Sequence, residues 1–120
     1  MGDVKTIMII DDDEHIRLLL KELLESSGYK VSLAKDGLEG MNKLKNEPVD
    51  LLLLDVRLPY ISGIGLIKIA RQHKPEIPII CMTGYGLSPE TMVEEECIEK
   101  LLRKPFKISE LLNAVNDMLK

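Results

Sequence analysis

Short apolar runs alternate with stretches of helical periodicity along the whole chain. Five of these runs are bounded by polar or turn-forming residues, which is typical of strands. They cover residues 5–10, 30–34, 49–54, 77–82 and 101–103. Strands that alternate with helices in this way predict βαβ units, a parallel sheet and right-handed crossovers.

Between the predicted strands, apolar residues recur at the three- and four-residue spacing of one helix face. Ser27-Gly28 and Pro48 are end signals for the first two helices, and Ser88-Pro89 is a typical start for a short, polar fourth helix. The apolar stripes of the other helices are expected at Ile16, Leu20, Leu23 and Leu24; at Leu38, Met41 and Leu44; at Ile64, Ile67, Ile69 and Ala70; and at Ile108, Leu111, Leu112, Val115 and Leu119.

Five strands alternating with five helices predict an α/β protein with a flavodoxin-like doubly wound (βα)5 fold. Its strand order is expected to be 2-1-3-4-5 in a parallel sheet. In this order the first, third and fourth strands lie side by side in the middle of the sheet. The length of 120 residues predicts one domain, residues 1–120, with no output domain in this chain.

The composition narrows the classes of function. Apolar residues make up 45% of the chain and charged residues 30%, as in ordinary globular proteins. The net charge is −4, aromatic residues are only 3%, and no basic stripe is visible, so we expect no direct binding to nucleic acid. Neither an apolar run of membrane-spanning length nor a signal peptide is visible, so we expect a cytoplasmic protein without membrane contact.

Chemically useful side chains stand where the predicted strands end. Asp11-Asp12, Asp55, Thr83 and Lys104-Pro105 each follow or close an apolar run. Because the carboxyl ends of parallel strands meet at one edge of the sheet, we expect these side chains to converge there. Crowded carboxylates repel one another unless a cation joins them, and Mg²⁺ prefers such oxygen ligands.

The four acidic residues after the first strand divide into two pairs. Asp13 and Glu14 are interpreted as the cap and first turn of the following helix, where acidic side chains are favourable. Asp11 and Asp12 are assigned to the metal because they belong to the end of the strand.

Asp55 closes an unbroken run of four leucines, where an ionised side chain is costly unless it is used or paired. A carboxylate that attacks phosphorus forms an acyl phosphate. Mg²⁺ would neutralise charge on the transferring group, while Thr83 and Lys104 would hold its equatorial oxygens.

Taken in order, these motifs resemble the receiver domain of two-component response regulators, of the chemotaxis-regulator type. The resemblance spans nearly the whole chain. It is carried by Asp11-Asp12, by Asp55-Val56-Arg57-Leu58-Pro59 followed by Gly63, by Thr83-Gly84, by Lys104-Pro105-Phe106, and by Gly37-Leu38-Glu39-Gly40-Met41 at the start of the second helix.

The resemblance implies a role for each site residue. Asp55 would be the phosphoacceptor, and Thr83 and Lys104 would contact the phosphoryl group. Mg²⁺ would be bound directly by Asp12, Asp55 and the backbone carbonyl of Arg57, with Asp11 helping directly or through water.

The resemblance also implies partners. The phosphoryl donor would be a phosphohistidine on a sensor histidine kinase or a phosphotransfer protein. The chain would catalyse only its own phosphorylation and the later hydrolysis of the acyl phosphate, so we do not expect an enzyme acting on a separate substrate. Phosphorylation would switch the face made by helix 4, strand 5 and helix 5 toward a downstream protein or a weak homodimer. Leu101 stands where the family usually has an aromatic residue.

Two alternatives stay open at this point. The first is a receiver-like interaction module that is not phosphorylated. The second is an aspartate-nucleophile phosphatase, suggested by Asp11 and Asp13 after an apolar strand, although Glu14-His15 follows and no cap domain is available. His15 and His73 are interpreted as surface residues.

Overall fold

The computed structural model describes residues 4–55, 63–83, 100–103 and 106–119. Their strands are β1 (Thr6–Ile10), β2 (Lys30–Ala34), β3 (Leu51–Asp55), β4 (Ile79–Thr83) and β5 (Lys100–Arg103). Their helices are α1 (Glu14–Ser26), α2 (Gly37–Asn46), α3 (Gly63–His73) and α5 (Ile108–Met118). The strands form one sheet in the order β2-β1-β3-β4-β5, and every neighbouring pair is parallel.

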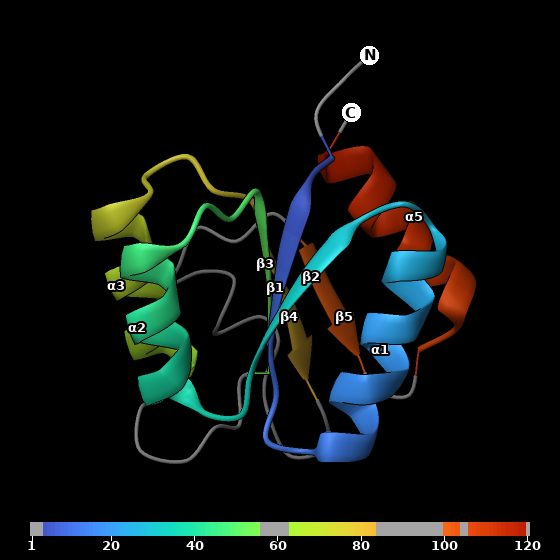
Figure 1. The fold of residues 1–120 in the computed structure, drawn as a ribbon, viewed down its shortest axis with the longest axis horizontal. Helices are drawn as coiled ribbons and strands as arrows, with labels where there is room; N and C mark the ends of the chain where they lie inside the picture. The colour runs from blue at the N-terminus through green and yellow to red at the C-terminus, as the bar shows by residue number, and fades with distance from the viewer. Residues whose placement is uncertain (1–3, 56–62, 84–99, 104–105, 120) are drawn as a thin grey trace.

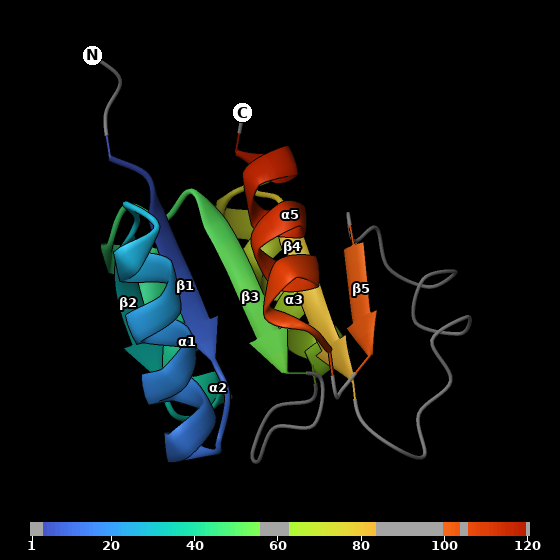
Figure 2. The same cartoon turned by 90° about the vertical axis from the view of Figure 1, so that its right-hand side faces the viewer.

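The sheet lies between two layers of helices. Helices α2 and α3 cover one face and α1 and α5 cover the other, as Figure 1 shows with the sheet seen edge-on. In Figure 2 the arrowheads of β1, β3, β4 and β5 point the same way, and β2 is parallel to β1, so the carboxyl ends of the strands form one edge of the sheet. This edge is the place where open α/β sheets bind their ligands.

Alternate residues along each strand fill two separate cores. On the α2–α3 side, Met8 and Ile10 of β1 join Leu52 and Leu54 of β3 in a cluster of buried residues. On the α1–α5 side, the intervening residues of the same strands join Leu20 and Leu24 of α1 and Leu111 and Val115 of α5. Strands buried on both faces read as continuous apolar runs, which is why β1 and β3 were visible in the sequence.

Helix α1 ends in a Schellman motif. The amide of Gly28 donates to the carbonyl of Glu25, and that of Tyr29 donates to the carbonyl of Leu24. Gly28 has φ of +97°, a conformation that a residue without Cβ adopts without strain. The predicted helix end at Ser27-Gly28 is therefore confirmed.

Helix α2 approaches β1 more closely than an ordinary side chain would allow. A Cβ atom placed on Gly40 would clash with Cδ1 of Ile10 and lie 3.1 Å from its Cγ1. Ile10 is the last residue of β1, directly before Asp11. The glycine in the first turn of α2 thus lets this helix pack against the strand end that carries the acidic residues.

The predicted α/β class with a parallel sheet is confirmed. The helix expected from Ser88 lies outside the described residues. Two stripe assignments were wrong, because Leu38 is 46% exposed and Ile108 is 51% exposed. Within the described part of the chain, no helix combines the length and the apolar character needed to cross a membrane.

Candidate functional site

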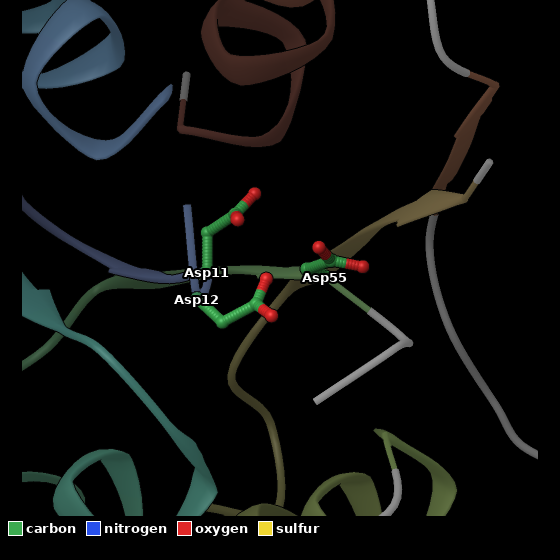
Figure 3. Close-up of side chains that lie close together, drawn as sticks. All are labelled: Asp11, Asp12 and Asp55. Atoms are coloured by element: carbon green, nitrogen blue, oxygen red, sulfur yellow. The ribbon is translucent and has the colours of Figure 1, made fainter. Parts of the chain in front are cut away.

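Three carboxylates meet at the carboxyl edge of the sheet. Asp11 and Asp12 follow β1, and Asp55 is the last residue of the neighbouring strand β3. One ligand oxygen from each of the three lies within 4.8 Å of those of the other two, and Figure 3 shows the side chains together. The register explains the meeting, because Ile10 is aligned with Leu54, so the next residues, Asp11 and Asp55, lie at the same level.

The three side chains differ in their exposure. Asp11 is fully buried and Asp55 is 6% exposed, whereas Asp12 is exposed. Buried carboxylates this close together repel each other, and the repulsion is relieved when a cation lies between them. The set offers only oxygen ligands and stays open to solvent at Asp12. These are the ligands Mg²⁺ prefers, and the open side leaves room for the waters and phosphate oxygens that complete its shell.

The turn between β1 and α1 is fixed by its own hydrogen bonds. The Asp13 carboxylate caps α1 by accepting from the amides of His15 and Ile16, at 2.9 and 3.2 Å. The Asp13 amide in turn donates to Oδ1 of Asp11 at 2.9 Å. The interpretation of Asp13 and Glu14 as the cap and first turn of α1 is confirmed, and Asp13 does not belong to the carboxylate cluster.

The first strand, predicted over residues 5–10, is found at Thr6–Ile10, so Asp11 and Asp12 directly follow its end. Asp11 keeps one sheet-like contact, because its amide donates to the carbonyl of Ala34 in β2 at 3.2 Å. The chain then leaves the sheet, so Asp12 lies in the turn. There the alternation of side chains between the two faces of a strand does not set the direction of its side chain.

Of the other predicted site residues, the structure places the backbone of Thr83. Thr83 is the last residue of β4, one position beyond Met82, which is aligned with Asp55. Thr83 itself is aligned with Arg103, the last residue of β5. The side chain of Thr83, and the whole of Arg57 and Lys104, lie outside the described residues. Both histidines, His15 and His73, are exposed, as expected.

Sequence reasoning missed Arg17. Its Nη1 donates to the backbone carbonyl of Asp11 at 2.7 Å, a contact that returns from α1 to the acidic turn. An arginine one turn inside a helix is usually interpreted as a solvent-exposed surface residue. The signal that was available is its position four residues after the helix cap, which lets a long side chain fold back over the turn.

Comparison with known proteins identifies the family. A family model, the response regulator receiver domain, matches residues 7–116 of this chain. The chain belongs to this family. Response regulator receivers are the signal-accepting domains of two-component systems, so this receiver is a component of phosphorelay signalling.

Curated relatives of this receiver are both short and long. The response regulator receiver protein CpdR of Brucella abortus is 33% identical over 97% of this chain and 98% of its own length. The alkaline phosphatase synthesis transcriptional regulatory protein PhoP of Bacillus subtilis is 37% identical over 97% of this chain. The receiver spans only 49% of PhoP, and the same share of the transcriptional regulatory protein CpxR of Escherichia coli.

Solved structures agree with the receiver fold. A CheY-like response regulator receiver domain from Methanospirillum hungatei has a TM-score of 0.92 and is 33% identical, covering 98% of this chain and 94% of that one. The response regulator TrrA of Thermotoga maritima, solved in complex with Mg²⁺–BeF, has a TM-score of 0.87 and is 31% identical, covering 96% and 99%.

Proposed function

We propose that this receiver accepts a phosphoryl group on Asp55 in a reaction that depends on Mg²⁺. The observation that carries the proposal is the meeting of the Asp11, Asp12 and Asp55 carboxylates within 4.8 Å, at the ligand-binding edge of the sheet. Support also comes from TrrA, a relative of 31% identity that was solved in complex with Mg²⁺–BeF.

The reaction is a transfer between nitrogen and oxygen. An oxygen of the Asp55 carboxylate attacks phosphorus, the P–N bond of a phosphohistidine breaks, and the imidazole keeps the bonding electrons and takes up a proton. The product is an acyl phosphate on Asp55. The donor is a phosphohistidine on a sensor histidine kinase or a phosphotransfer protein, and water later hydrolyses the acyl phosphate.

Each acidic residue has a part in holding the cation. Asp12 and Asp55 would bind Mg²⁺ directly, and the buried Asp11 would help directly or through a water. The backbone carbonyl of Arg57 would be a further ligand, as the family resemblance implies. When bound, Mg²⁺ neutralises negative charge on the transferring group.

Thr83 and Lys104 hold the oxygens of the phosphoryl group. The backbone position of Thr83 at the end of β4, directly beside β3, is consistent with this role. Lys104 follows Arg103, which is aligned with Thr83 in the sheet. A hydroxyl and an ammonium would then share the contacts to the oxygens of the phosphoryl group.

Phosphorylation switches the face that includes β5 and α5, which then binds a downstream protein or a second copy of the receiver. Leu101 lies in β5, aligned with Cys81 of β4, at the position where the family usually has an aromatic residue. The switch in this chain therefore works with an aliphatic side chain at that position.

The decisive experiment is a Phos-tag gel after incubation with acetyl phosphate and Mg²⁺. We expect a shifted band for the wild type, and no shift for Asp55→Asn or in the presence of EDTA. Asp50→Asn is the matched control, because Asp50 lies directly before β3, at the end away from Asp55, where it accepts from the amide of Thr6 at 2.8 Å. This control should shift like the wild type.

Two other results would support the alternatives. An unshifted wild type with an intact fold would favour an interaction module that is not phosphorylated. Steady turnover of a phosphomonoester such as p-nitrophenyl phosphate would instead favour a phosphatase. Transfer from a phosphorylated histidine kinase, followed with ³²P, would then test the proposed donor.

A further inference from the structure

Arg17 of α1 contacts the acidic turn that connects β1 to α1. It lies in the first half of α1, and its guanidinium returns to the carbonyl of Asp11 at 2.7 Å. The side chain is partly buried, so the contact is shielded from competition with solvent. No part of the proposed phosphoryl transfer uses this residue.

The bond fixes a peptide group that matters for the cation. The carbonyl of Asp11 and the amide of Asp12 belong to one planar peptide unit. Its plane sets the direction in which the Asp12 side chain leaves the backbone. Asp12 lies beyond the ladder of β1, so the ladder does not fix that direction.

Asp11 is held on its other sides as well. Its amide donates to the carbonyl of Ala34 at 3.2 Å, and its Oδ1 accepts from the amide of Asp13 at 2.9 Å. Without Arg17, the carbonyl would lose the contact from α1 that holds the Asp11–Asp12 peptide. The two neighbouring hydrogen bonds would remain, so we expect a local change in the turn rather than loss of the fold.

The positive charge of Arg17 has the opposite effect on the affinity for Mg²⁺. A guanidinium near three carboxylates lowers their attraction for an added cation. If charge dominated, removing Arg17 would tighten Mg²⁺ binding; if positioning dominated, removing it would weaken binding. The hydrogen bond goes to a neutral carbonyl at the short distance of 2.7 Å, which favours positioning.

We propose that Arg17 is a positioning residue for the cation site. Its hydrogen bond to the Asp11 carbonyl orients the Asp11–Asp12 peptide so that the Asp12 carboxylate stays beside those of Asp11 and Asp55. This inference rests on the proposed function, because it concerns the Mg²⁺ bound by the same three carboxylates. Outer-sphere partners of this kind change metal affinity by roughly 10- to 100-fold when they are lost.

The test is the dissociation constant of Mg²⁺ for the whole chain, measured by isothermal titration calorimetry. We expect Arg17→Met to weaken binding about 10-fold, and Arg17→Lys, which keeps a long donor, to recover part of the loss. Lys21→Met is the matched control: it removes a positive charge from the next turn of α1, where Lys21 contacts Glu25 at 2.9 Å. It should bind Mg²⁺ like the wild type.

Thermal unfolding without Mg²⁺ checks that each variant is folded. If Arg17→Met does not fold, Arg17→Gln, which is too short to reach the carbonyl, takes its place with the same expectation. Equal or tighter Mg²⁺ binding by the folded neutral variant overturns the positioning role. A wild type that binds no Mg²⁺ at all would overturn the proposed function itself, and this inference with it.

Discussion

The turns after β1 and β2 are built from similar local chemistry but differ in their surroundings. Each leaves a strand, caps the next helix with an aspartate, and places a glutamate in the first helical turn. Asp13 caps α1, and Asp36 caps α2 by accepting from the amide of Glu39 at 2.8 Å. Only the turn after β1 contributes to the carboxylate cluster.

The difference comes from the place of each strand in the sheet. β1 lies between β2 and β3, so the residues that follow it face Asp55 at the end of β3. β2 is the outermost strand on its side and has only β1 as a neighbour. An acidic strand-to-helix turn becomes a candidate metal site only where a second strand brings another carboxylate to the same level.

The largest expected effect is on Mg²⁺ affinity, which should depend on the acidic residues of the turn after β1 and not on those of the turn after β2. Asp12→Asn removes a direct ligand and should raise the dissociation constant by roughly 10- to 100-fold, equivalent to about 1.4–2.7 kcal/mol. Asp36→Asn removes the same charge from the second turn and keeps an efficient helix cap, so it should leave the constant unchanged. Isothermal titration calorimetry measures both, and equal losses in the two variants would show that the comparison is wrong.

A second prediction concerns the packing of α2, which follows the second turn, against the end of β1, which precedes the first turn. Gly40→Ala, in the first turn of α2, should lower the free energy of unfolding by about 2 kcal/mol because its Cβ would clash with Ile10. Adding Ile10→Val removes the clashing Cδ1 methyl and should restore part of the loss. Urea unfolding of the single and double variants gives the coupling free energy, and simple additivity would mean that the clash is absorbed elsewhere.

The smallest effects should be alike in both turns. Asp13→Ala and Asp36→Ala each remove a helix cap, and each should lower the free energy of unfolding by about 1 kcal/mol. Asparagine at either position accepts the same amide hydrogen bonds and should restore most of that stability. A much larger loss for Asp13→Ala, measured by urea unfolding without Mg²⁺, would show that capping is not its main contribution.

The apolar pattern predicted the elements well and their ends less well. Residues 30–34 were predicted and found as a strand, but the strand expected at 49–54 is Leu51–Asp55. Val49 is 8% exposed and Ile77 is 5% exposed, yet both lie before the strands that follow them. Apolar character reports burial, whereas strand ends are set by backbone pairing, which the pattern does not contain.

Leu38 shows a second reason for error. The buried face of α2 passes through Gly37, Gly40 and Leu44, and Leu38 is about 100° away from Gly37 around the helix. Gly40 marks this face because the side chain of Ile10 fills the space where its Cβ would lie, a feature that counting apolar residues cannot detect. Ile108 lies on the inward side of α5 but is its first residue, where little of the sheet is left to cover it.

The sequence by itself determined the alternation of strands and helices, the acidic cap at Asp13 and the presence of polar residues at the strand ends. These follow from local propensity, hydrogen bonding within a few residues and the need to bury apolar side chains. The tertiary structure decided which acidic residues form a site. Asp55 meets Asp11 and Asp12 because β3 pairs with β1 in a register that aligns Ile10 with Leu54, so Asp55 lies level with the start of the acidic turn.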